Sequence, residues 1–93
     1  MSPPSRRSAV ARIPNKRGLH ARASAKLVEA ASRFKSHITV AKDGQNVEAV
    51  SIMGLMMLAA SMGSEIEIVA EGPDADEAMT AILALIEVKF GED

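Results

Sequence analysis

The sequence contains no cysteine, and its only aromatic residues are two phenylalanines. Without cysteine there is no disulfide, no thiol nucleophile and no cysteine-ligated zinc site. A small cysteine-free domain fits a reducing compartment, so we expect a cytoplasmic protein. No apolar run approaches the ~18 residues of a membrane span, and the arginines near the start precede no apolar stretch of the kind a secretory signal needs.

Charge is distributed unevenly along the chain. Residues 1–42 hold ten lysines and arginines against one acidic residue, whereas residues 43–93 hold one against eleven. The two halves could fold against each other, or a basic surface could face an acidic partner, a phosphate or a nucleic acid. Two phenylalanines provide almost no platform for stacking bases, so we expect no nucleic-acid partner.

Length and composition predict a single folded domain. The 93 residues are 47% hydrophobic and 25% charged, which is typical of a chain that builds one core. Residues 1–7 are polar with two prolines and predict a disordered tail. We place the domain at residues 8–90 and a short C-terminal tail at 91–93.

Hydrophobic periodicity predicts seven elements in the order β-α-β-β-α-β-α. Strands are expected at 8–13, on both sides of Asp43-Gly44 within 37–50, and at 65–70, and helices at 21–34, at 51–63 and after Gly72-Pro73. Asp-Gly between two extended runs is typical of a type I′ hairpin. The order closes most simply as an α+β fold, in which helices cover one face of a mostly antiparallel sheet.

His20 lies at a junction, in the run GLHARASAKLVEA, directly before the first predicted helix. The exposed N–H groups of a helix start would hold an anion attached to its ring, and Arg22 adds a positive charge. A histidine that carries a phosphoryl group needs such surroundings. The alternative is an ordinary polar residue that ends a loop. The other histidine, His37, reads as a solvated strand residue, and two separated histidines predict no metal site.

The second predicted helix is apolar nearly all round. Ser51 is its expected N-cap. One face is formed by Leu55, Leu58 and Ala59, and the other by Ile52, Met53, Met56 and Met57. The methionines could fill the core, or they could remain exposed as an adaptable contact surface for partners.

These segments resemble a known family. The runs NKRGLHARASAKLVEAASRF and SIMGLMMLAASMGSEIEIVAEGPDADEA, with the element order, are similar to HPr, the phosphocarrier of the bacterial phosphotransferase system. The first run and the C-terminal end look closest to its nitrogen-related branch, NPr. SIMGLMML looks as much like the sugar-transport branch. The resemblance implies an open-faced β-sandwich, with four antiparallel strands and three helices on one face.

The resemblance also implies site residues and partners. His20 would accept a phosphoryl group from enzyme I and pass it to IIA proteins, with Arg22 and the backbone of Ala21 and Arg22 holding the phosphate. Ser51 matches a serine that HPr kinase/phosphorylase modifies. The matching partner-docking residues are Ile52, Met53 and Met56. The family implies a monomer that needs no cofactor, a carrier rather than an enzyme.

Two positions depart from the family pattern. Ala23 stands where proline usually follows the arginine, and we expect the helix start to survive, because alanine is a good helix former. Val50 stands where a basic residue often precedes the regulated serine, which bears on Ser51 and not on His20. A relative that kept the fold and lost the relay would lack the histidine, which is present here.

Overall fold

The computed structural model describes residues 5–92, and its elements follow the predicted β-α-β-β-α-β-α order with one short 3-10 turn added. The elements are β1 (Ser5–Arg12), α1 (Ala21–Ala31), β2 (His37–Lys42), β3 (Gln45–Glu48), α2 (Ile52–Met57), β4 (Glu65–Gly72), α3 (Ala75–Glu87) and η1 (Lys89–Gly91). Within residues 5–92, no helix is long and apolar enough to cross a membrane.

The four strands form one antiparallel sheet in the order β1-β4-β2-β3. Burial along the central strand β4 alternates strictly: Ile66, Ile68 and Ala70 are buried, while Glu65 and Glu67 are exposed. One face of the sheet therefore belongs to the core and the other faces solvent.

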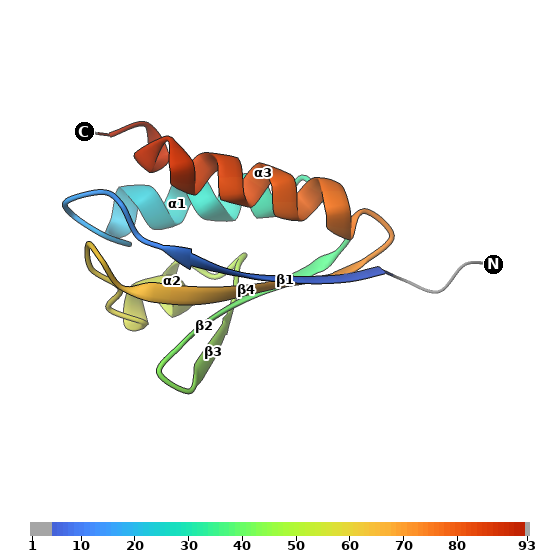
Figure 1. Ribbon diagram of the computed structural model, residues 1–93, viewed down its shortest axis with the longest axis horizontal. Coiled ribbons are helices and arrows are strands. Elements are labelled where there is room, and N and C mark those ends of the chain that lie inside the picture. Colours follow the sequence, from blue (N-terminus) through green and yellow to red (C-terminus); the bar gives the residue numbers. More distant parts are fainter. Residues whose placement is uncertain (1–4, 93) are drawn as a thin grey trace.

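The helices cover the buried face. α1 and α3 lie side by side over it (Figure 1), and the short α2 packs against α1 and β3. Leu27 of α1 and Ile82 of α3 are fully buried against the sheet, in a core continuous with Leu55 of α2. The predicted open-faced β-sandwich is confirmed.

The turn between β2 and β3 has the predicted chemistry. Asp43 and Gly44 have φ values of 50° and 83°, as a type I′ turn requires at both central positions. The start of α1 is also as expected, because the helix begins at Ala21 with Ala23 fully buried in its first turn.

Three predicted boundaries are wrong. β1 begins at Ser5, so Ser5–Arg7 of the predicted tail belong to a strand that pairs with β4 as far as Gly72. Residues 1–4 lie outside the described residues. α1 ends at Ala31 rather than at 34. α2 ends at Met57 rather than at 63, because Ala59 adopts a left-handed conformation with a φ of 52°.

Candidate functional site

A tight loop places His20 at the start of α1. Gly18 has a φ of 64°, and a Cβ at this position would lie 2.2 Å from the carbonyl oxygen of Ala60. The N–H of Leu19 donates to the same carbonyl at 2.9 Å. The loop therefore lies directly against the turn after α2, at a separation that only glycine allows.

His20 is the N-cap of α1. Its backbone is extended, with φ −72° and ψ −179°, and its carbonyl accepts the N–H of Ser24 at 2.9 Å. The ring nitrogen Nδ1 accepts the N–H of Arg22 at 3.3 Å. Nδ1 thus faces the N–H groups of the first turn, which have no partner within the helix. It also faces the positive end of the helix dipole. The predicted position of His20 at the first turn is confirmed.

Glu92 covers the other side of the imidazole. Its Oε2 lies 2.7 Å from His20 Nε2, and each of the two side chains is only 18% exposed. Its Oε1 accepts a hydrogen bond of 2.9 Å from Nδ2 of Asn15, which is fully buried. The bond from Asn15 lowers the pKa of Glu92 below its ordinary value of 4.5, against the opposing effect of burial. The hydrogen bond and charge of His20 lower it further.

A compact turn after α3 brings Glu92 to this position. Lys89, Phe90 and Gly91 all have positive φ, at 58°, 56° and 77°. Phe90 is fully buried, and its carbonyl accepts a hydrogen bond of 2.7 Å from Nζ of Lys26 in α1. The turn is thus attached to α1, the helix that His20 caps.

Asn15 and Glu92 are not among the predicted site residues. The predicted tail at 91–93 is wrong for Gly91 and Glu92, and Asp93 lies outside the described residues. One signal in the sequence is Phe90, because phenylalanine is among the residues most often buried, and its burial brings the residues that follow it close to the core.

Arg22 contributes its backbone donor and an exposed side chain. The N–H groups of Ala21 and Arg22 belong to the first turn of α1, where an anion on His20 would meet them. The side chains of Lys16 and Arg17 are exposed nearby in the loop. The charge of Arg17 also lowers the pKa of Glu92.

Ser51 caps α2, as predicted. Its Oγ accepts the N–H of Gly54 at 2.9 Å. Gly54 has little free space, because a Cβ there would lie 3.0 Å from both Ser51 Oγ and the Cβ of Val47. The cap hydroxyl is therefore held closely at the junction between β3 and α2.

The apolar residues of the second predicted helix divide as their spacing predicts, except that Ala59, which lies beyond the end of α2, is exposed. Leu55 and Leu58 are buried. We call Ile52, Met53 and Met56 the α2 surface, since their exposed fractions are 42%, 72% and 43%. These methionines do not fill the core, and this outcome favours the contact-surface alternative.

The remaining candidates lie elsewhere. His37 is exposed on β2, with Nε2 2.7 Å from a carboxylate oxygen of Glu48, in agreement with its reading as a solvated strand residue. Among residues 5–92, no three or more His, Asp or Glu side chains gather in a way that could hold a metal ion.

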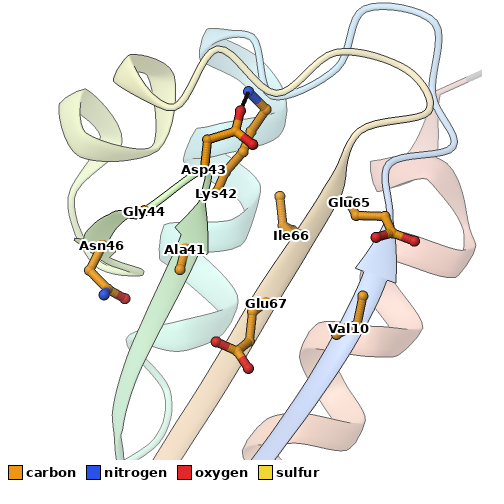
Figure 2. A pocket seen from close by; sticks show the side chains of 9 residues that line it. All are labelled: Val10, Ala41, Lys42, Asp43, Gly44, Asn46, Glu65, Ile66 and Glu67. Carbon is orange, nitrogen blue, oxygen red and sulfur yellow. Dashed lines mark hydrogen bonds and ion pairs between the residues drawn. The ribbon is translucent and has the colours of Figure 1, made fainter.

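A hollow of about 350 Å³ lies on the open face of the sheet, and His20 is not among the residues that line it. Figure 2 shows its lining residues on all four strands and in the turn between β2 and β3, with α1 and α3 behind the strands. Lys42 there is paired with Asp43 at 2.9 Å, and Glu65 and Glu67 add negative charge. This acidic, open hollow does not suit a phosphate, so it is not a candidate for a phosphoryl site.

Comparison with known proteins points to one family. The family described as "PTS HPr component phosphorylation site" matches residues 8–88. Phosphocarrier protein HPr of Cupriavidus necator is 55% identical over 80 residues, which cover 86% of this chain and 90% of the relative. Phosphocarrier protein NPr of Shewanella violacea is 46% identical over 80 residues, covering 86% and 88%.

Solved structures agree in fold and in sequence. HPr-C-His from Thermoanaerobacter tengcongensis matches with a TM-score of 0.90 and 48% identity, over 94% of this chain and 98% of that one. HPr from Bacillus anthracis matches with a TM-score of 0.84 and 43% identity, over 88% and 98%. Sequence family, relatives and fold thus coincide over nearly all of the chain, which belongs to the HPr family of phosphotransferase-system phosphocarriers.

Proposed function

We propose that His20 is the phosphoryl acceptor of this phosphocarrier, taking the group from enzyme I and passing it to IIA proteins. One observation carries the proposal: His20 Nδ1 lies at the N-terminus of α1, in contact with the N–H of Arg22. A helix N-terminus holds phosphate through its free N–H groups and its dipole. Family membership supports the same assignment, because relatives of both the HPr and NPr branches match this chain.

The transfer begins at Nδ1. Its lone pair attacks phosphorus, the bond between phosphorus and the donor atom of enzyme I breaks, and the donor atom keeps that electron pair. The N–H of Arg22, which now donates to Nδ1, would pass to a phosphoryl oxygen, and the N–H of Ala21 lies beside it in the first turn. The exposed guanidinium of Arg22 could add a charge-assisted hydrogen bond from the solvent side.

A relay must hold its phosphoryl group only moderately. Each ~1.4 kcal/mol of extra stabilisation would slow onward transfer about tenfold if the transition state gained nothing. A site with two backbone donors and one exposed arginine fits this requirement better than a closed, fully charged pocket. The protein is accordingly a carrier and not an enzyme that turns over a substrate by itself.

The α2 surface is the proposed docking site for enzyme I and for IIA proteins. Its three side chains are exposed and apolar, and α2 packs directly against α1, whose first residue follows His20. Methionine side chains adapt to different partners, which suits a carrier that must bind a donor and an acceptor in turn.

Ser51 is proposed as a regulatory phosphorylation site for an HPr kinase/phosphorylase. Its position at the N-terminus of α2 would tolerate a phosphate, because oxygen atoms there already accept the N–H of Gly54. The added charge would lie next to Ile52 and Met53, so its effect would fall on partner docking.

Phosphorylation by phosphoenolpyruvate and enzyme I tests the acceptor. Intact mass should show one acid-labile phosphoryl group on the wild type and on His37→Ala, and none on His20→Ala. His37 is a matched control, because it too is a histidine paired with a carboxylate. Labelling of His20→Ala, or loss of labelling in His37→Ala, would contradict the assignment.

A further inference from the structure

Glu92 touches the proposed acceptor at the ring nitrogen that does not react. Its Oε2 lies 2.7 Å from His20 Nε2, whereas Nδ1 faces the helix N–H groups. We propose that Glu92 is a positioning residue for phosphoryl transfer: its carboxylate keeps a proton on Nε2 and stabilises the positive ring that forms when Nδ1 takes the phosphoryl group. This inference rests on the function proposed for His20.

The two contacts of the ring require the same tautomer. The lowered pKa of Glu92 keeps its carboxylate ionised at neutral pH, and an ionised carboxylate only accepts hydrogen bonds. The hydrogen of the 2.7 Å contact is therefore on Nε2. On the opposite side, Nδ1 accepts the N–H of Arg22 and so carries no hydrogen. The free lone pair is on the nitrogen that lies at the helix terminus.

The charge of the ring changes during transfer, and this change gives the carboxylate its role. A neutral ring with its hydrogen on Nε2 becomes an imidazolium once Nδ1 bonds to phosphorus, since no proton leaves. The carboxylate lies against the positive N–H that results, much as an aspartate supports the histidine of a serine-protease triad. Onward transfer reverses the change: the Nδ1–P bond breaks, Nδ1 recovers its electron pair, and a neutral imidazole leaves.

Loss of the Nε2 proton would hinder that second step. The phosphorylated ring would then be neutral, and transfer would have to expel an imidazolate anion, which is a much poorer leaving group. The Glu92 carboxylate disfavours this deprotonation, because loss of the Nε2 proton would leave its negative charge facing a nitrogen that has no hydrogen to donate. Glu92 thus keeps the phosphoryl group in a form that can be passed on.

The surroundings of Glu92 hold its carboxylate in one orientation. Nδ2 of the buried Asn15 donates to Glu92 Oε1 and to the carbonyl of Gly18, both at 2.9 Å. A flipped amide would place its oxygen against these two acceptors, so the orientation is fixed even though Asn15 Oδ1 has no partner among the described residues. The hydrogen bond of 2.7 Å from Lys26 to the carbonyl of Phe90 secures the preceding turn.

Neighbouring charges limit repulsion of the incoming phosphoryl dianion. Arg17 lies close enough to Glu92 to interact with its charge, and Lys26 is bound to the same turn. The carboxylate also lies on the opposite side of the ring from Nδ1. It can therefore stabilise the ring without facing the phosphate.

The first test compares Glu92→Gln with Glu87→Gln in the full-length chain. Glutamine keeps the size of the side chain and removes its charge. We expect Glu92→Gln to slow transfer both from phosphorylated enzyme I and onward to a IIA protein by about tenfold, the factor that corresponds to one charge-assisted hydrogen bond. Glu87 is exposed at the end of α3, and its variant should transfer at the wild-type rate.

The second test reads the Nε2 proton itself. In ¹⁵N NMR spectra of phospho-His20 at mildly alkaline pH, Nε2 should carry its proton in the wild type and in Glu87→Gln, and lose it in a larger fraction of Glu92→Gln molecules. A purely structural role of Glu92 would not change this fraction. Circular-dichroism melts of the three proteins establish that each one is folded.

Two outcomes overturn the inference. Equal protonation of Nε2 in the wild type and in Glu92→Gln removes the proposed role, and transfer that is unchanged or faster in Glu92→Gln shows that the carboxylate merely covers the ring. Either result leaves the acceptor role of His20 intact, because that role is tested by labelling of His20→Ala. Absence of label on wild-type His20 would instead overturn the proposed function, while the ¹⁵N spectrum of the unphosphorylated ring would still report the Glu92 contact.

Discussion

Gly18 sets the geometry on which His20 depends. It combines a left-handed backbone with the closest approach between the β1–α1 loop and the turn after α2. A side chain here would have to displace backbone atoms, since the Cβ would meet the carbonyl of Ala60 and the Cα of Ser61. The residue therefore limits which backbone conformations can position His20.

We expect Gly18→Ala to destabilise the protein strongly. The clash forces the loop apart and adds to the backbone cost, so the free energy of unfolding should fall by roughly 3 kcal/mol or more. Gly63→Ala is the control: its φ is 90°, but nothing lies within 4 Å of the added Cβ, so it should cost only about 1 kcal/mol. Urea unfolding of both variants decides this, and equal losses would refute the role of the close approach.

Ser51 combines a structural role with a proposed regulatory one, and two substitutions separate them. Ser51→Ala removes the cap and should lower stability by about 1 kcal/mol while phosphoryl transfer stays normal. Ser51→Asp keeps a capping oxygen at the helix N-terminus, so its melting temperature should stay near that of the wild type, while transfer from enzyme I slows. Wild-type transfer rates in Ser51→Asp would leave the residue as a cap and nothing more.

α2 is an element with two apolar faces and different requirements on each. Leu55 is fully buried, whereas Met53 is 72% exposed. The element is only six residues long, so it depends on its buried face and its cap for stability. Its exposed face is free to serve partners.

Substitutions on the exposed face should therefore affect partner binding, and substitutions on the buried face should affect stability. Met53→Glu should leave the thermal melt unchanged and weaken binding to enzyme I, because a charge in a contact core must be desolvated without a partner. Leu55→Ala should lower the free energy of unfolding by about 2–5 kcal/mol through the cavity that it leaves. Calorimetric binding and melting curves measure the two effects, and collapse of the Met53→Glu melt would show that this methionine belongs to the core.

The elements also show what local pattern can reveal. The strict alternation in β4, the Asp43-Gly44 turn and the Ser51 cap were predictable, because each is determined by residues next to one another in the chain. The early start of β1 was not, because Arg6 and Arg7 have no apolar alternation and join the sheet only through pairing with β4. The left-handed Ala59 that shortens α2 likewise has no local signal.

At the scale of the whole molecule, the candidate site is assembled from both ends of the sequence. His20 was predictable, since its position before a helix is a local property. Glu92 was not, because the contact spans 72 positions and depends on how α3 and its final turn pack across α1. Periodicity carries no information about a single residue beyond the last helix.

Long-range contacts of this kind also determine the response to acid. Asp74, before α3, accepts hydrogen bonds from Ser36 Oγ at 2.6 Å and from the N–H groups of Lys35 and Ser36 at 2.9 Å. The Ser36 hydroxyl first, and then the Lys35 N–H, lower the pKa of Asp74 below its ordinary value of 3.8. The carboxylate joins the start of β2 to the start of α3.

Stability should accordingly fall in acid. A carboxyl group with a lowered pKa stabilises the fold fully above its ordinary value, here 3.8 for Asp74 and 4.5 for Glu92, and this contribution is lost as pH falls through the folded-state pKa. The melting temperature of the wild type should therefore decrease below about pH 4. Asp74→Asn should melt lower at neutral pH and show a shallower decrease in acid; an equally steep decrease would contradict the role of Asp74.

The placement of the chain ends has a practical consequence for handling the protein. The start of β1 and the end of η1 lie at opposite ends of the molecule (Figure 1), and Glu92, which follows η1, is in contact with the ring of His20. An affinity tag joined after residue 93 would begin one residue beyond that contact, where a polyhistidine sequence would add imidazoles that compete for the Glu92 carboxylate. The start of β1 is remote from that contact, so a purification sequence placed on the β1 side of the domain is the choice that keeps labelling experiments interpretable.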